Sequence, residues 1–194
     1  GVEVICDPGA VFRARSAAAA GFISVTGAYA WVSASDAEGV ATIVTPTGHP
    51  ETHGFTPGCF LRNAVTMDEY YITEILETGW NIRVDTALPA GNYWIHQTGI
   101  QWRGGTFIGS QGIAIDLSSA AHCRFSGSHF RLVAAGSTIS LLRLSNCTDV
   151  VFEDFYGDLG LGELHSAVAP GLETNLRVEI RNCRFTNGIS IGEM

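Results

Sequence analysis

The chain has no lysine, so its eleven basic residues are all arginine. Charged residues make up only 15% of the 194 positions, and the net charge is −8 at pH 7. An acidic chain without a basic cluster argues against nucleic acid as a partner. No apolar run approaches the ~18–20 residues of a membrane-spanning helix. We therefore expect neither nucleic-acid binding nor membrane insertion.

Closely paired cysteines are also absent. The five cysteines are odd in number and widely spaced, at Cys6, Cys59, Cys123, Cys147 and Cys183. Structural zinc sites use short ligand spacings such as C-x-x-C, and secreted disulfide frameworks use even counts. We expect no metal, no cofactor and no disulfide framework, with the thiols buried as small apolar side chains.

What the sequence does contain is 46% hydrophobic residues and 23 glycines, well above the ~7% glycine norm. The apolar residues fall in short runs cut by Gly, Asn, Asp and Pro, which indicates many short strands. Helical periodicity is scarce. The segment Thr66–Ile75 fits a short helix, although its Glu69–Ile75 part also fits a strand.

The C-terminal half carries an irregular repeat of strand, polar corner, cysteine and second strand. Leu141–Leu144 leads to Asn146-Cys147, and Arg177–Ile180 leads to Asn182-Cys183. Repeats of this length indicate stacked units that bury their cores only together. Stacking would place Cys over Cys and Phe over Phe. The two asparagines would then occupy corners where the backbone is in the left-handed or the bridge conformation, which Asn tolerates.

Three segments resemble coils of the pectate-lyase-like right-handed parallel β-helix superfamily, of the bacteriophage tailspike type. They are Ile5–Phe12 (ICDPGAVF), Leu88–Ile95 (LPAGNYWI) continued by Ile100–Ile108, and Val178–Ile191 (VEIRNCRFTNGISI). The resemblance implies an all-β, right-handed parallel β-helix (solenoid) with a small antiparallel β insertion. We expect the first coil or coils at 1–27, the insertion at 28–86 and further coils at 87–194.

We expect a catalytic or sugar-binding site near the densest acidic stretch. Glu153, Asp154 and Asp158 are candidate catalytic acids, because glycosidases of either stereochemistry use two carboxylates. Aromatic rings can stack on sugars and acids can bind their hydroxyls, so the candidate carbohydrate-binding residues are Phe155, Tyr156, Asp116 and Glu179. The alternative is a solvated charged face that protects solubility.

Two further motifs look like functional sites, but local structure explains them better. His49 and His53 could offer two metal ligands, but Pro50 favours a loop over the helix that such a site needs. Ser190 lies in a G-x-S-x-G pattern with no helix after it, so we interpret it as a strand residue.

The resemblance implies a phage or phage-like spike or fibre protein that recognises a host cell-surface polysaccharide. The implied partners are that polysaccharide, further copies in a homotrimer and other virion proteins, with the virion as its location. Two alternatives stay open: a polysaccharide depolymerase (glycosidase or lyase) on the same scaffold, and a purely structural virion component. The short chain favours binding or structure over cleavage.

Overall fold

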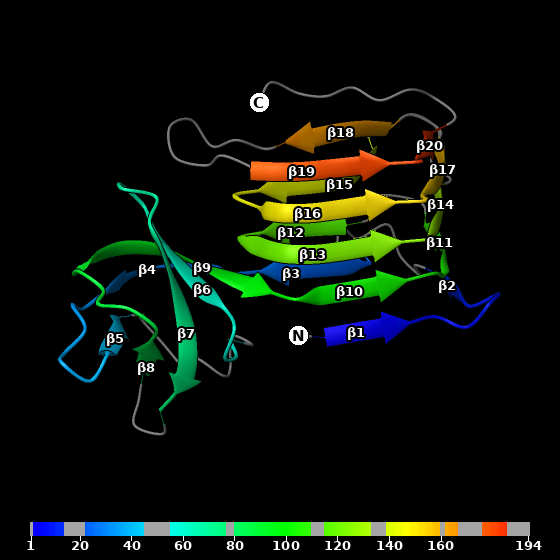
Figure 1. Cartoon of the computed structure of the whole chain (residues 1–194). Coiled ribbons are helices and arrows are strands. Elements are labelled where there is room, and N and C mark those ends of the chain that lie inside the picture. The colour runs from blue at the N-terminus through cyan, green and yellow to red at the C-terminus, as the bar shows by residue number, and fades with distance from the viewer. Residues whose placement is uncertain are drawn as a thin grey trace. The chain divides into compact units, whose positions relative to one another are not determined.

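The computed structural model describes residues 2–13, 22–44, 55–76, 80–109, 115–132, 139–159, 162–166 and 176–185. Every regular element in these ranges is a β-strand (Figure 1). The strands divide into two compact units, one over Thr26–Gly99 and one formed by Val2–Val25 together with Ile100–Met194. Across the same ranges, no helix has the length and apolar character needed to cross a membrane.

The unit over Thr26–Gly99 is a closed antiparallel β-barrel. Its six strands follow the order β9-β4-β5-β8-β7-β6, and pairing of β6 with β9 closes the ring. The strands are β4 (Ala28–Val32), β5 (Val40–Val44), β6 (Phe60–Asn63), β7 (Glu69–Ile75), β8 (Asn81–Val84) and β9 (Gly91–Thr98).

Alternation of side chains builds the barrel core. On β4, Ala30 and Val32 point inward and are buried, whereas Tyr29 and Trp31 are exposed. The turn before β5 depends on Gly39, whose φ of 79° is left-handed and whose added Cβ would lie 3.0 Å from the Val84 carbonyl oxygen. The inward side chains form a core of their own, including Ile43, Leu61, Ile72, Ile82, Tyr93 and Ile95.

The expected fold class, a right-handed parallel β-helix with a small antiparallel insertion, is therefore wrong for this chain. The antiparallel part is a closed six-stranded barrel with its own core, not a small excursion from a solenoid. The segment Leu88–Ile95 was expected to form a parallel coil, yet β9 pairs antiparallel with β4 and β6. Alternation predicts a strand but not the direction of its neighbours, which explains the error. Thr66–Ile75 likewise contains a strand, β7, and no helix.

The other unit contains three parallel sheets, and successive circuits of the chain add one strand to each (Figure 1). Sheet one holds β1 (Val2–Ile5), β10 (Ile100–Arg103), β13 (Ala120–Ser126), β16 (Thr148–Glu153) and β19 (Leu176–Arg181). Sheet two holds β2 (Val11–Arg13), β11 (Thr106–Gly109), β14 (His129–Leu132), β17 (Tyr156–Leu159) and β20 (Arg184–Phe185). Sheet three holds β3 (Ile23–Thr26), β12 (Ile115–Ser118), β15 (Ile139–Ser145) and β18 (Gly162–Ser166).

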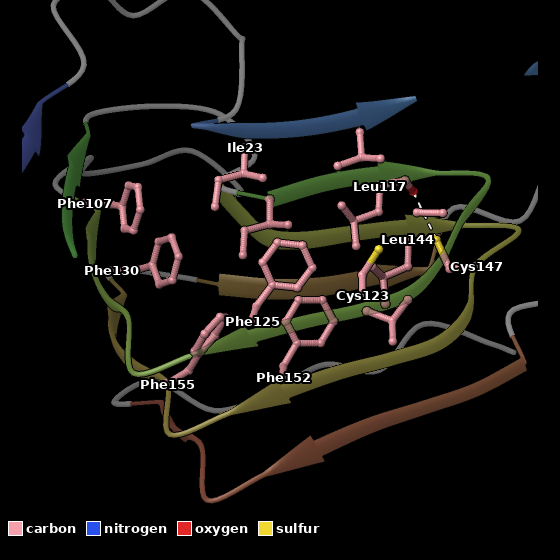
Figure 2. Packing of buried hydrophobic residues seen from close by; sticks show 14 residues of the cluster. Ile23, Phe107, Leu117, Cys123, Phe125, Phe130, Leu144, Cys147, Phe152 and Phe155 are labelled. Atoms are coloured by element: carbon pink, nitrogen blue, oxygen red, sulfur yellow. Dashed lines mark hydrogen bonds between the residues drawn. The ribbon is translucent and has the colours of Figure 1, made fainter. Parts of the chain in front are cut away.

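Inward side chains of this three-sheet unit stack along the sheets, as Figure 2 shows. The rings of Phe125 and Phe152 lie 5.3 Å apart and nearly parallel, and those of Phe107 and Phe130 lie 4.8 Å apart. Phe155 joins them against Phe130 at 5.3 Å. Full burial of a Phe side chain contributes about 1.5–3 kcal/mol, so these columns are a main source of the unit's stability. The predicted stacking of Phe over Phe is confirmed.

Left-handed residues turn the chain from one sheet to the next. Asn146 and Asn182 have φ values of 52° and 50°, which is the left-handed one of the two predicted conformations. The two asparagines occupy different corners, however, because Asn146 lies between sheets three and one and Asn182 between sheets one and two. The predicted stacking of Cys over Cys is wrong, since Cys123 is in register with Val150.

Candidate functional site

The acidic candidates do not gather in one group. Glu153 ends β16 and Glu179 lies in β19, both in sheet one, whereas Asp116 lies in β12 of sheet three. Asp116 and Glu179, two of the candidate carbohydrate-binding residues, therefore lie on separate sheets. Asp154 is exposed at a left-handed corner with φ 55°. Of the candidate catalytic acids, Glu153 and Asp154 thus lie at the end of β16 and at the corner that follows it.

Glu153 is held by an arginine on the neighbouring strand. The Arg124 guanidinium donates from Nε and Nη2 to Glu153 Oε1, at 2.9 and 2.7 Å, and from Nη2 to Oε2 at 2.8 Å. Fork-shaped contacts of this kind stabilise the ionised carboxylate. Glu153 and Arg124 thus form a partly exposed ion pair between β16 and β13. Glu179 is likewise paired, with Arg181.

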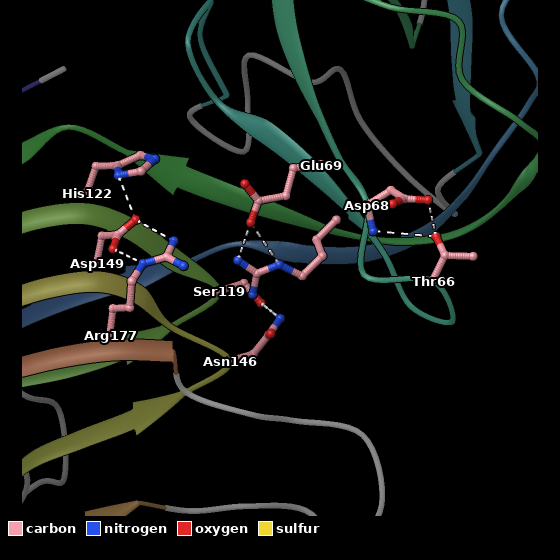
Figure 3. A network of polar contacts seen from close by, with 9 residues as sticks. Thr66, Asp68, Glu69, Ser119, His122, Asn146, Asp149 and Arg177 are labelled. Carbon is pink, nitrogen blue, oxygen red and sulfur yellow. Dashed lines mark hydrogen bonds and ion pairs between the residues drawn. The ribbon is translucent and has the colours of Figure 1, made fainter.

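A second polar group runs across three strands of sheet one (Figure 3). His122, Asp149 and Arg177 occupy equivalent positions on β13, β16 and β19, all with φ close to 52°. Asp149 accepts hydrogen bonds from Nε and Nη2 of Arg177, and His122 Nδ1 lies 3.3 Å from Asp149 Oδ2. Because Arg177 occupies both carboxylate oxygens, the group is an exposed polar ladder and not a metal site. In the described ranges, no group of three or more His, Cys, Asp or Glu side chains could hold a metal.

Sheet two presents a different outward face, on which Tyr156 lies between two cationic or polar side chains. His129, Tyr156 and Arg184 are in register on β14, β17 and β20. The His129 ring meets the Tyr156 ring edge-on at 4.9 Å, and the Arg184 guanidinium carbon lies 6.0 Å from the centre of the Tyr156 ring. Tyr156 keeps 41% of its surface exposed.

Arginines add positive charge to this face. Arg13 and Arg131 are exposed on β2 and β14, in register with Ile108 of β11 between them. No ion pair among the described side chains involves Arg13, Arg131 or Arg184. Sheet two thus carries three exposed arginines that make no ion pair with a described side chain, and Asp158 is in register with one of them, Arg131.

The aromatic candidates separate into one exposed and one buried ring. Tyr156 is exposed, but Phe155 retains only 1% of its surface and packs in the core against Phe130 and Phe152. Phe155 thus cannot stack on a sugar. The backbone of Asp158 lies in β17 in register with Arg131, and its side chain falls outside the described part of the structure. His49, His53 and Ser190 also lie outside the described residues.

Sequence reasoning did not single out His129, Arg131 or Arg184 as one group. Each lies next to a Phe or Cys in the sequence. Because side chains alternate along a strand, an inward neighbour indicates that the residue itself faces outward. Their proximity, however, depends on the register between strands more than twenty residues apart in the sequence. Alternation within one strand carries no such information.

The thiols of the three-sheet unit are not arranged for nucleophilic chemistry. Burial raises the pKa of the Cys147 thiol to about 11, and burial also raises the pKa of Cys183. Reactive cysteines need the opposite shift, because the thiolate is the nucleophile. The buried Cys147 therefore serves as a small core residue.

Comparison with known proteins gives little further identification. No protein-family model and no curated protein matches the chain. Among solved structures, the tailspike protein gp49 from Pseudomonas phage LKA1 is similar, with 12% identity and a TM-score of 0.42 over 87% of this chain. The match covers 37% of the tailspike chain, so this chain spans little more than a third of that protein's length. A likeness at this level defines neither the fold nor the activity of the chain.

Proposed function

We propose that the chain is a spike or fibre module that binds an acidic polysaccharide of a host cell surface through the outward face of sheet two. The observation that carries this proposal is the row His129–Tyr156–Arg184, in which an exposed ring is flanked by an imidazole and a guanidinium. The polarised C–H bonds of a sugar pack on an aromatic face, and the guanidinium fork matches a carboxylate.

The direction of the row suits a polymer. Strands of a sheet lie about 4.8 Å apart, so side chains in register on successive strands form a straight line along the stack. The row continues from Tyr156 and His129 to Thr106 and Val11 in the same register. Arg13 and Arg131 lie beside this line and add positive charge along its first part, before the register reaches Asp158 on β17. Carboxylate groups repeated along a glycan would meet them in turn.

Binding is favoured over cleavage by the position of the candidate acids. Glu153, the acid with the best-defined surroundings, is bound by Arg124 on sheet one and lies outside the sheet-two row. A depolymerase would need two carboxylates placed about the scissile bond. We also propose a homotrimer, a location in the virion and contacts with other virion proteins. These proposals rest on the resemblance of Ile5–Phe12 and Val178–Ile191 to tailspike coils. Light scattering of the purified chain tests the trimer.

A polysaccharide panel tests the binding proposal. Purified chain is titrated with polygalacturonate, alginate and hyaluronan, with dextran and mannan as neutral polymers, and with capsular and O-antigen polysaccharides. We expect binding to at least one acidic polymer, and at least a tenfold weaker affinity for Tyr156→Ala and Arg184→Ala. The matched control is Arg103→Ala, which removes an exposed arginine from sheet one.

Reducing ends and ultraviolet absorbance are followed in the same reactions. New reducing ends that disappear in Glu153→Gln would overturn the binding-only proposal in favour of a depolymerase. Neither binding nor cleavage on any polymer would overturn it in favour of a structural component. Equal loss of affinity in Arg184→Ala and Arg103→Ala would show that sheet two is not the site.

A further inference from the structure

The barrel carries an exposed aromatic surface on strands β4 and β9. Tyr29 and Trp94 oppose each other in register, with ring centres 4.4 Å apart and planes inclined by 48°. Trp31 lies two residues along β4 on the same face, opposite Asn92 of β9 and Val44 of β5. Tyr29 and Trp31 expose 47% and 45% of their surfaces.

The barrel core does not require these rings. The inward positions of β4 are filled by Ala30 and Val32, and the core is complete without Tyr29 and Trp31. A cross-strand aromatic pair contributes about 0.2–1 kcal/mol to a sheet, which accounts for Tyr29 with Trp94. It does not account for Trp31, whose neighbours in register are an amide and an aliphatic side chain.

The chemistry and the size of the surface both restrict its occupant. The five side chains Tyr29, Trp31, Val44, Asn92 and Trp94 carry no formal charge. The charged side chain in register with Trp94 on β6, Arg62, is neutralised by its ion pair with Glu69. Aromatic side chains cover about 150–250 Å² each when fully buried, so two half-exposed rings offer roughly 200 Å². A stable protein interface buries about 800 Å² on each partner. The surface is therefore small for a protein partner and matches one or two sugar rings.

We propose that Tyr29, Trp31 and Trp94, together with Asn92, form a binding platform for an uncharged sugar ring. The apolar face of a pyranose would stack on the indole and phenol rings, whose faces are electron-rich. The Asn92 side-chain amide, which can both donate and accept, would reach the hydroxyl groups at the rim of the sugar. This site is separate from the basic row of sheet two and takes ligands of different charge.

Tryptophan fluorescence of the whole chain provides the test. The chain has four tryptophans, and two of them, Trp31 and Trp94, belong to the platform. The probes are cellohexaose, xylohexaose, mannohexaose and laminarihexaose. We expect at least one of these neutral oligosaccharides to change the emission saturably, and Trp31→Ala and Trp94→Ala to weaken that affinity at least tenfold.

Matched variants keep the outcomes distinct. Trp80→Phe alters a tryptophan outside the platform and should leave the affinity unchanged, and circular dichroism verifies that each variant is folded. Arg184→Ala should leave neutral-sugar binding intact, and Trp31→Ala should leave acidic-polymer binding intact, so failure of one site does not imply failure of the other.

Results of two kinds would overturn the proposal. One is that no neutral oligosaccharide changes the emission, or that Trp31→Ala binds as well as Trp80→Phe. The other is a concentration-dependent dimer, seen by light scattering, that Trp31→Ala abolishes, because the surface would then be covered by a second copy of the chain.

Discussion

Replacing Asn146 by Ala should destabilise the three-sheet unit far more than the same change at Asn182. Both residues are left-handed, with φ values of 52° and 50°. Asn146 is only 2% exposed, and its Nδ2 donates a hydrogen bond of 3.1 Å to Ser119 Oγ on the previous circuit (Figure 3). Asn182 is exposed.

The magnitudes separate the two contributions. Holding Ala instead of Asn in the left-handed conformation costs about 1 kcal/mol. A buried polar group that loses its hydrogen-bond partner costs about 1–3 kcal/mol. We expect Asn146→Ala to cost about 2–4 kcal/mol and Asn182→Ala about 1 kcal/mol. Asn146→Gly, which removes the hydrogen bond without the backbone strain, should lie between them.

Urea unfolding followed by circular dichroism, with the free energy extrapolated to water, measures these differences. Equal costs for Asn146→Ala and Asn182→Ala would refute the reasoning, because the buried contact to Ser119 would then contribute nothing. Equal costs for Asn146→Gly and Asn146→Ala would show that left-handed strain is not released by glycine at this corner.

Three further predictions concern the core, a thiol and an ion pair. Phe130→Ala should cost about 3–5 kcal/mol in urea unfolding because Phe130 is fully buried, whereas Phe12→Ala, at a 38% exposed ring, should cost clearly less; equal costs would refute the role given to the phenylalanine column. Because the pKa of Cys147 is about 11 in the folded chain and 9.0 for an ordinary thiol, the unfolded state loses its proton first as pH rises, so stability should fall between pH 9 and pH 11. Cys147→Ala should make that fall smaller but not abolish it, because burial also raises the pKa of Cys183. Replacing Glu153 by Gln should cost no more than about 1 kcal/mol, because Arg124 is half-exposed; a loss of several kcal/mol in the same urea assay would contradict this.

The sequence predicts the strands of this protein better than it predicts how they pair. Alternating residues indicate that Arg177–Ile180 forms a strand, which lies within β19, and the last part of the expected coil segment Leu88–Ile95 lies within β9. The asparagine corners are left-handed, one of the two conformations expected of them. The direction of pairing is a property of two segments together, so the antiparallel pairing of β9 with β4 and β6 was not predicted. The closure of the barrel depends on β6 meeting β9 across a long separation in the sequence.

The candidate site shows the same limit. Phe155 and Tyr156 were named together as sugar-binding candidates, yet Tyr156 is exposed at the start of β17 and Phe155 turns into the core. The left-handed corner at Asp154 changes the alternation between them. Glu153 could be identified as a strand-end acid, but not as the partner of Arg124, which lies 29 residues earlier. Local pattern therefore predicts which side chains are outward, and the register between strands decides which of them meet.

The salt dependence of acidic-polysaccharide binding tests the proposed role of sheet two most directly. Electrostatic screening lengths fall from about 10 Å at 0.1 M salt to about 3 Å at 1 M. We expect the affinity of the wild-type chain for the acidic polymer to fall at least tenfold over this range, and the affinity of a double variant, Arg131→Ala with Arg184→Ala, to be weak and nearly independent of salt. An affinity that is the same at both salt concentrations, or unchanged in the double variant, would contradict a basic polysaccharide-binding face on sheet two.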